Sequence, residues 1–189
     1  MLIKDCFSTP IYSSHLDIDT NVYIEKVYQE ESKSKGRQKT NTGWQSNDIN
    51  ANEYKELFDK ITPHMIEYYK IFKCPAELCM SNAWFNINRY KDGNATHHHS
   101  FSAISGVLYF KVPENSGDIG FDNPNPFIGS TWLQATREHS FNKYNTETIF
   151  YKSEEKLLIL FPSYLRHVVQ PNMSNEDRIS MAFNSNVYF

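Results

Sequence analysis

The sequence predicts a mainly β domain of the sandwich or barrel type, preceded by supporting helices. Before residue 80, apolar residues recur at steps of three and four, the period of an amphipathic helix. After residue 80 the period changes to about two, which is typical of strands. Turn residues, such as those at 113–118, separate the short apolar segments of this second part. Strands that follow helices in this way favour a sandwich or barrel with helices on one face.

The length of 189 residues fits one domain. We expect residues 1–189 to form a single unit, with helical support and an edge strand in residues 1–80 and the β core in residues 81–189. The net charge is −3 and no basic block stands alone, so nucleic acid is not a favoured partner. Three widely spaced cysteines indicate no disulfide framework. Without an apolar leader or an 18-residue apolar run, we expect a soluble, cytoplasmic protein with no membrane partner.

The N-terminal part contains one predicted edge strand and two predicted helical regions. Pro10 is tolerated in an edge strand, which we place at residues 7–12. A helix is expected over 17–31, with Asp17, Asp19 or Asn21 as its cap. Residues 32–50 are polar and are expected to form a loop. The clearest helical pattern covers 52–72, where Pro63 should either kink one helix or begin a second.

The C-terminal part is expected to consist of strands. At residues 81–90 small or apolar side chains alternate with a Trp and two Asn, so this strand should have two different faces. Further strands are expected at 103–112, 119–121, 130–136, 147–152, 156–161, 166–170 and 178–188.

Three histidines form the densest set of metal-ligand side chains. In an extended segment His97 and His99 point to the same side, whereas His98 points to the other. His167 follows the apolar strand at 157–161 and can face them across a barrel. Two imidazoles joined by a third group from another strand make a facial site for a first-row metal.

Arg178 and Ser180 share one face of the last predicted strand. Ile179, Met181 and Phe183 take the opposite face and should pack in the core. An arginine in this position can hold a carboxylate bidentately, and the hydroxyl of Ser180 can share that carboxylate. The alternative is a surface ion pair between Arg178 and one of the two acidic residues that precede it.

Taken together, these motifs resemble the small 2-oxoglutarate/Fe(II)-dependent oxygenases of bacteria and their phages, in the prolyl-hydroxylase-like superfamily. The resemblance covers most of the chain and is most specific in its C-terminal half. It is carried by residues 7–10, 43–46, His97-x-His99, 105–109, 161–167, Arg178-Ile179-Ser180 and 183–184. It implies a double-stranded β-helix, which is a jelly-roll or cupin-like barrel.

The resemblance also implies cofactors and a reaction. His97, His99 and His167 would bind Fe(II), while Arg178 and Ser180 would hold the distal carboxylate of 2-oxoglutarate. The three histidines and Arg178 would then be the catalytic set. Conversion of 2-oxoglutarate to succinate and CO2 would be coupled to hydroxylation of an unactivated C–H bond.

Three further residues are candidates for contacts inside this site. Tyr109 lies on the strand after the first ligands and is a candidate for the same carboxylate. Asn86 and Tyr90 are expected on one face of their strand, where they could contact co-substrate or substrate.

The sequence departs from the wider superfamily at one ligand position. That superfamily uses two histidines and a carboxylate, but His99 stands at the carboxylate position. The site is therefore either a three-histidine site or one that Asp122 completes, and a metal other than iron stays an alternative.

Other functions are compatible with the same residues. A cupin-type enzyme would use the histidines but would give Arg178 no role, and a non-catalytic metal- or ligand-binding module would keep the fold. For the oxygenase, the substrate could be a small molecule or an amino-acid side chain, and a modified nucleobase is a further option. The oligomeric state is open, with a homodimer among the options.

Overall fold

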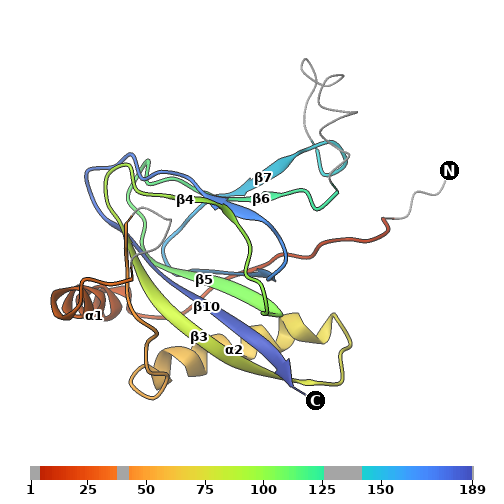
Figure 1. Ribbon diagram of the computed structural model, residues 1–189, viewed down its shortest axis with the longest axis horizontal. Helices are drawn as coiled ribbons and strands as arrows, with labels where there is room; N and C mark the ends of the chain where they lie inside the picture. Colours follow the sequence, from red (N-terminus) through yellow and green to blue (C-terminus); the bar gives the residue numbers. More distant parts are fainter. Residues whose placement is uncertain (1–4, 38–42, 126–141, 189) are drawn as a thin grey trace.

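The computed structural model describes residues 5–37, 43–125 and 142–188, and these form two helices and two antiparallel sheets (Figure 1). The elements in chain order are β1 (Tyr12–His15), α1 (Thr20–Lys33), β2 (Trp44–Gln45), α2 (Lys55–Lys70), β3 (Glu77–Asn88), β4 (Asn94–His97), β5 (Ile104–Lys111), β6 (Ile119–Asp122), β7 (Thr148–Tyr151), β8 (Leu157–Pro162), β9 (His167–Val169) and β10 (Arg178–Tyr188). The predicted mainly β fold with N-terminal helices is confirmed.

The two sheets differ in size. The larger has six strands in the order β1-β8-β5-β10-β3-β2, and the smaller has four in the order β4-β9-β6-β7. The smaller sheet lies above one face of the larger in Figure 1, and the helices lie on the other side. This is the arrangement of a double-stranded β-helix. The strand expected at 130–136 falls outside the described residues.

The two faces of the larger sheet differ along β3 and β10. Phe85 on β3 and Met181 on β10 belong to the core that the helices cover. Asn86 and Ser180, each one residue away, line a cavity on the opposite face. Since successive strand residues point to opposite faces, the predicted alternation at residues 83–88 and 178–183 is confirmed.

Helix α1 begins where its capping residue predicts. Asp19 is the N-cap, and its side chain accepts a hydrogen bond of 3.1 Å from the backbone N–H of Asn21. The buried Tyr23 stacks on Phe110 of β5 with ring centroids 5.2 Å apart. The helix therefore covers the apolar face of the larger sheet at β5.

Helix α2 continues through Pro63 as a single helix, so the alternative of a second helix is excluded. Thr62, just before the proline, donates its hydroxyl to the carbonyl of Phe58 at 2.7 Å. The buried side chains follow the three- and four-residue steps of the sequence and are Leu57, Phe58, Ile61, Met65 and Tyr68.

Two expectations for the N-terminal part need correction. The edge strand is present but covers Tyr12–His15 rather than 7–12, because Pro10 lies before the paired residues. The region 32–50, expected as a loop, contains β2, in which Trp44 pairs with Ile87 and Gln45 with Asn86. A strand of two residues is too short to show any period in the sequence.

Among the described residues, no helix is long and apolar enough to cross a membrane.

Candidate metal and co-substrate site

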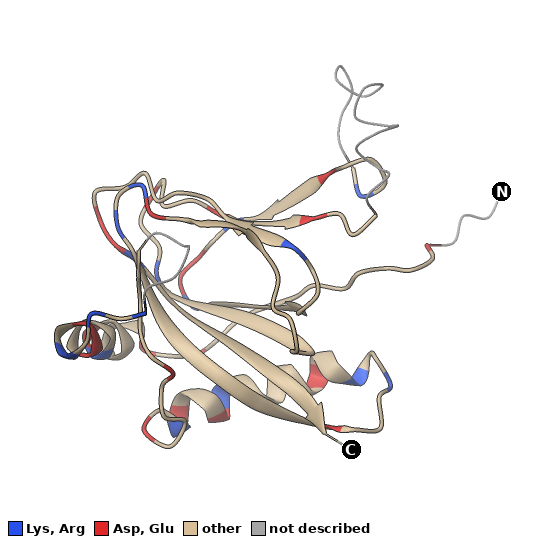
Figure 2. Cartoon of the chain, in the orientation of Figure 1, with Lys and Arg blue, Asp and Glu red and all other residues tan. Residues whose placement is uncertain are grey.

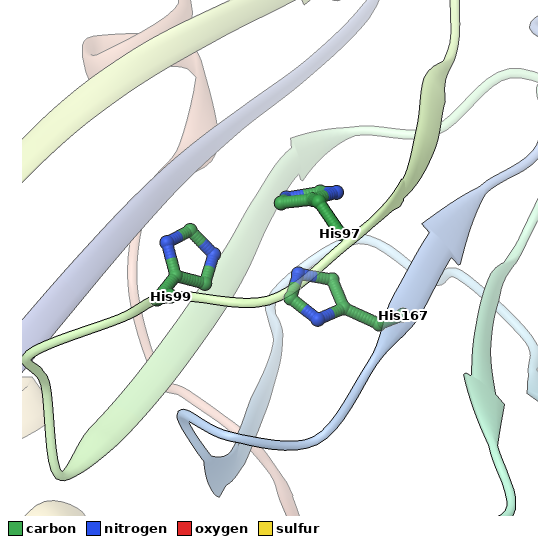
Figure 3. Close-up of side chains that lie close together, drawn as sticks. All are labelled: His97, His99 and His167. Carbon is green, nitrogen blue, oxygen red and sulfur yellow. The ribbon is translucent and has the colours of Figure 1, made fainter.

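The structure brings the three predicted histidines together. His97 ends β4 and lies directly opposite His167 of β9, and His99 follows two residues later (Figure 3). One ring nitrogen from each of the three lies within 4.8 Å of those of the other two. Imidazole nitrogens bind first-row metals at about 2.0–2.1 Å, so two nitrogens on one ion lie at most about 4.2 Å apart. The cluster is close to the spacing that a shared metal requires.

Backbone carbonyls orient two of the imidazoles. The Nδ1 atom of His97 lies 2.8 Å from the carbonyl oxygen of Ala95, and Nδ1 of His167 lies 2.9 Å from that of Leu165. A carbonyl only accepts, so Nδ1 carries the hydrogen in both rings. Nε2 is left as the basic atom of each ring, which is how protein histidines are prepared for metal binding.

The turn between β8 and β9 connects two of the ligands. Its Ser163 carbonyl accepts the backbone N–H of His99 at 3.0 Å, and its Leu165 carbonyl accepts Nδ1–H of His167. The Ser163 hydroxyl is fully buried and lies 2.8 Å from that of Ser105, which donates to Oδ1 of Asn184 at 2.7 Å. The turn is thereby fixed to both β5 and β10.

The imidazole of His167 is held in the neutral form. Burial, and after it the neighbouring His97, lowers its pKa to about 3. The ring is 3% exposed and also contacts Phe161, with centroids 4.7 Å apart. A neutral ring needs no deprotonation before it ligates a metal.

A cavity of about 300 Å³ is lined by the histidine cluster and by polar side chains of β2, β3, β5 and β10. Four of its residues form one cross-strand row over β5, β10, β3 and β2, and they are Tyr109, Ser180, Asn86 and Gln45. Arg178 lies two residues before Ser180 on β10 and therefore belongs to a neighbouring cross-strand row, in which it is opposite Asn88 of β3. The sheet register thus places the predicted residues Arg178, Ser180, Tyr109 and Asn86 around one cavity.

Arg178 is buried, at 1% exposure, with no carboxylate partner among the described residues. Its Nη1 donates to the carbonyls of Ser116, Gly117 at 3.1 Å and Gln170 at 3.2 Å. Its Nη2 is buried and has no acceptor in the part of the chain that the structure describes. Burial lowers the pKa of this guanidinium, and the adjacent Tyr109 opposes that shift. An unmatched cation with a free donor is a favourable site for a carboxylate.

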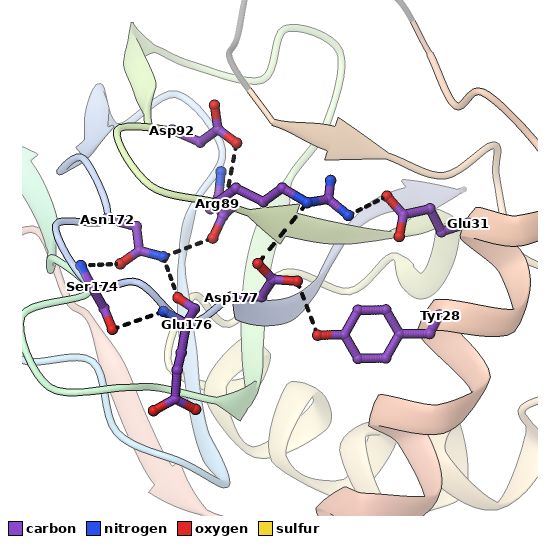
Figure 4. A network of polar contacts seen from close by, with 9 residues as sticks. Tyr28, Glu31, Arg89, Asp92, Asn172, Ser174, Glu176 and Asp177 are labelled. Atoms are coloured by element: carbon purple, nitrogen blue, oxygen red, sulfur yellow. Dashed lines mark hydrogen bonds and ion pairs between the residues drawn. The ribbon is translucent and has the colours of Figure 1, made fainter.

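The acidic residues before Arg178 are engaged elsewhere, which excludes the surface ion pair. Asp177 accepts the hydroxyl of Tyr28 at 3.0 Å and lies 4.0 Å from Arg89, which also pairs with Glu31 of α1 at 2.7 Å (Figure 4). Glu176 pairs with a lysine of β5 at 2.9 Å. These contacts hold the start of β10, and with it Arg178, against α1.

The cavity lining is nearly free of charged side chains. Of the described residues that line it, none is Asp, Glu or Lys, and Arg178 is the single arginine. Figure 2 shows that acidic and basic residues gather on helices, turns and strand ends rather than along the long strands of the larger sheet. An anion bound in the cavity would therefore meet the guanidinium without a competing carboxylate.

The structure does not support three of the expectations for this region. The carboxylate of Asp122 belongs to another hollow of the surface, where it accepts the hydroxyl of Thr148 at 3.0 Å and lies 3.7 Å from Arg166. It cannot complete the triad, since its neighbour Phe121 takes the inward face of β6. Tyr90 lies beyond the end of β3 and is 51% exposed, outside the cavity lining. His98 is outside the cluster as expected, but it borders the same cavity instead of pointing away from it.

The comparison with protein families agrees with this geometry. Residues 82–184 match the family described as "Putative 2OG-Fe(II) oxygenase", which is more than half of the 189 residues. The chain belongs to this family. The match contains all three histidines and Arg178, and the family's cofactors are Fe(II) and 2-oxoglutarate. No curated protein matches the sequence.

Several solved structures share the fold at low sequence identity. The prolyl-4-hydroxylase of Pseudomonas putida aligns with a TM-score of 0.64 at 10% identity, covering 95% of this chain and 94% of that one. The viral collagen prolyl hydroxylase of Paramecium bursaria Chlorella virus-1, in complex with 2-oxoglutarate, aligns at 0.62 and 15%, covering 93% and 94%. HygX of Streptomyces hygroscopicus, with nickel and 2-oxoglutarate bound, aligns at 0.65 and 10%, covering 96% and 84%. These likenesses establish the double-stranded β-helix.

The residues fit both cofactors of the family. Three imidazoles, of which two are oriented by carbonyls, suit Fe(II). The free Nη2 of Arg178 suits the carboxylate of 2-oxoglutarate. No carboxylate joins the cluster in the part of the chain that the structure describes, so the cluster is a three-histidine triad. A cupin-type enzyme would leave Arg178 without a role, and the family match decides against it.

Sequence reasoning missed residues that act through their position in the sheet. Gln45 lines the cavity because its strand partner is Asn86. Asn184 lines it as the third residue of the face that begins with Ser180. The alternation in β10 could have identified Asn184. Gln45 belongs to the segment 43–46 that carries part of the resemblance, but no periodic pattern there shows its strand partner or the direction of its side chain.

Proposed function

We propose that this chain hydroxylates an unactivated C–H bond, with 2-oxoglutarate converted to succinate and CO2. The observation that carries the proposal is the buried Arg178, which lies in the same cavity as three imidazoles and whose Nη2 has no acceptor from any described residue. A buried cation without a counter-ion is costly, and a dicarboxylate that also reaches the metal would remove that cost.

Each residue has a proposed role. His97, His99 and His167 hold Fe(II) through one nitrogen each, and Nη2 of Arg178 binds the distal carboxylate of 2-oxoglutarate. Ser180 and Tyr109 are directly opposite each other on neighbouring strands, which supports the proposal that both donate their hydroxyls to the same carboxylate. Burial raises the pKa of Tyr109, so its hydroxyl keeps its hydrogen. Asn86, opposite Ser180, is a further candidate for contact with the co-substrate.

Bound Fe(II), together with 2-oxoglutarate and O2, supplies the oxidation, in which one oxygen atom enters succinate and the other enters the substrate C–H bond. The chain contributes orientation and exclusion of water. Trp84 and Phe161 flank the histidines, with the Trp84 and His99 rings 5.9 Å apart. The substrate is a small molecule or an amino-acid side chain, as in the prolyl hydroxylases that share the fold.

Anaerobic titration with Fe(II) and then with 2-oxoglutarate tests the proposal, followed by a succinate assay in air. We expect one Fe(II) and one 2-oxoglutarate per chain, with slow succinate formation even without substrate. His167→Ala should lose Fe(II) binding. His15 is a surface histidine beside Glu154, so His15→Ala should still bind Fe(II). Failure of the Fe(II)-loaded protein to bind 2-oxoglutarate would refute the proposal.

A further inference from the structure

Gln45 carries a buried polar group that the proposed reaction does not use. It is 7% exposed and lines the cavity, and its Oε1 has no hydrogen-bond partner among the described residues. Its neighbour on β2, Trp44, points to the apolar core instead. Since strand neighbours face opposite ways, the Gln45 side chain is directed at the cavity. A buried acceptor left without a donor is unfavourable, so the site favours a ligand that supplies one.

The sheet register places Gln45 away from the co-substrate anchors. The cross-strand row runs from Tyr109 through Ser180 and Asn86 to Gln45. Directly opposite residues lie about 5 Å apart, so the row extends over roughly 15 Å. The four carbon–carbon bonds of 2-oxoglutarate, at about 1.5 Å each, span no more than about 6 Å. A co-substrate held by Arg178 and Ser180 leaves Gln45 for another molecule.

Asn86 and Gln45 together present one donor and one acceptor. Oδ1 of Asn86 accepts the indole N–H of Trp84 at 3.2 Å. This leaves its NH2 group as the donor that Asn86 can direct into the cavity, and the two hydrogens allow contact with co-substrate and substrate together. The neighbouring Oε1 of Gln45 is an acceptor. One amide group, with its C=O and N–H, is complementary to this pair.

The surroundings favour an uncharged ligand group. Apart from Gln45, the cavity lining contains five more carboxamides, at Asn82, Asn86, Asn88, Asn94 and Asn184. Asp48, which lies 3.4 Å from the amide nitrogen of Asn82, is already paired with Arg37. Among the described lining residues, Arg178 is the single Lys, Arg, Asp or Glu, and it lies in a different cross-strand row from Gln45.

We propose that Gln45 and Asn86 form the subsite that binds a neutral amide group of the substrate, as in a peptide segment, with its N–H donated to Oε1 of Gln45. This inference rests on the proposed oxygenase function and names the substrate class of the same cavity. Gln45 would determine specificity, since a site that hydrogen-bonds a substrate N–H rejects analogues that lack it.

The test uses the full chain with Fe(II), as wild type and as Gln45→Leu. The first measurement is the 2-oxoglutarate Kd, which we expect to differ by less than about twofold between them. If the wild type does not bind 2-oxoglutarate, the proposed function fails at this step, independently of Gln45.

The second measurement is succinate formation above the substrate-free rate. Three sets of probes are used. The first contains the N-acetyl N-methylamides of the standard amino acids, and the second contains the corresponding N-acetyl methyl esters, which lack the C-terminal N–H. The third contains neutral sugars. We expect at least one amide to stimulate the wild type, with its ester roughly tenfold poorer in kcat/KM. In Gln45→Leu this ratio should fall to about one, whereas Gln45→Asn should retain part of it.

An unchanged amide-to-ester ratio in Gln45→Leu would overturn the assignment. Stimulation by sugars but not by amides, or by none of the probes, would also overturn it, because 2-oxoglutarate binding has by then been shown in the first measurement.

Discussion

The guanidinium of Arg178 is proposed to hydrogen-bond backbone carbonyls and also to bind the carboxylate of 2-oxoglutarate. Replacing Arg178 by lysine tests these two functions separately. Nη1 donates to the carbonyls of Ser116, Gly117 and Gln170, while Nη2 has no partner within residues 5–37, 43–125 and 142–188. A lysine ammonium has all its donors on a single nitrogen, so it cannot reach the three carbonyls and a ligand carboxylate together. We expect it to stay with the carbonyls, because leaving them unpaired inside the protein is costly.

The expected loss of affinity follows from this geometry. Removing one partner of a buried, hydrogen-bonded charge pair costs about 2–5 kcal/mol. Lysine keeps the charge, so we take the lower part of that range, about 2–3 kcal/mol. The Kd for 2-oxoglutarate should therefore rise roughly 30- to 150-fold at 25 °C. Fe(II) affinity should hardly change, because Arg178 is not a ligand in the histidine cluster.

Anaerobic titration of the Fe(II)-loaded variant with 2-oxoglutarate, followed by visible absorption, measures this change. Arg166→Lys is the matched control, since its side chain is 63% exposed and pairs with Asp122 outside the cavity. Thermal melts of both variants show whether the fold is kept. A 2-oxoglutarate Kd within about threefold of wild type in a folded Arg178→Lys would refute the reasoning.

Three further outcomes are expected. His99→Ala should lose at least about 100-fold in Fe(II) affinity, measured by competition with a chelator, and His98→Ala should bind as wild type does. The metal-free protein should lose stability as pH falls from about 6.5 towards 3, because His167, with its pKa lowered to about 3, stays neutral when folded but is protonated when unfolded. Urea titrations should show that the free energy of unfolding falls by up to about 1.4 kcal/mol per pH unit through this group. His167→Gln should lack this contribution to the pH dependence. Ser163→Ala should lower the free energy of unfolding by about 1 kcal/mol and weaken Fe(II) binding roughly tenfold, and unchanged Fe(II) affinity would show that the hydroxyl has no role at the ligands.

The part of the site on regular strands could be predicted from the sequence. On β10 the period of two assigns Arg178 and Ser180 to one face and Ile179 to the other, and the structure has this arrangement. The His97-x-His99 spacing likewise places both imidazoles on one side of the chain, and His167 meets them because β9 pairs with β4. Local geometry and one strand pairing were sufficient here.

Features that depend on distant loops or very short strands could not be predicted. The acceptors for Nη1 of Arg178 come from two separate turns, at residues 116–117 and at Gln170. Asp122 was a plausible ligand by composition, but the alternation within β6 directs it away from the cavity. Gln45 faces the cavity through the pairing of a two-residue strand, which leaves no periodic pattern.

The opposed positions of His97 and His167 have a consequence for the lifetime of the protein. A metal bound by both would cross-link β4, a four-residue edge strand, to β9 and to the segment that carries His99. It would close a long loop of the chain and stabilise the folded state by about 2.7 kcal/mol at a free metal concentration 100 times Kd. Iron supply would then set how much of this protein survives proteolysis in the cell, as well as how much of it is active.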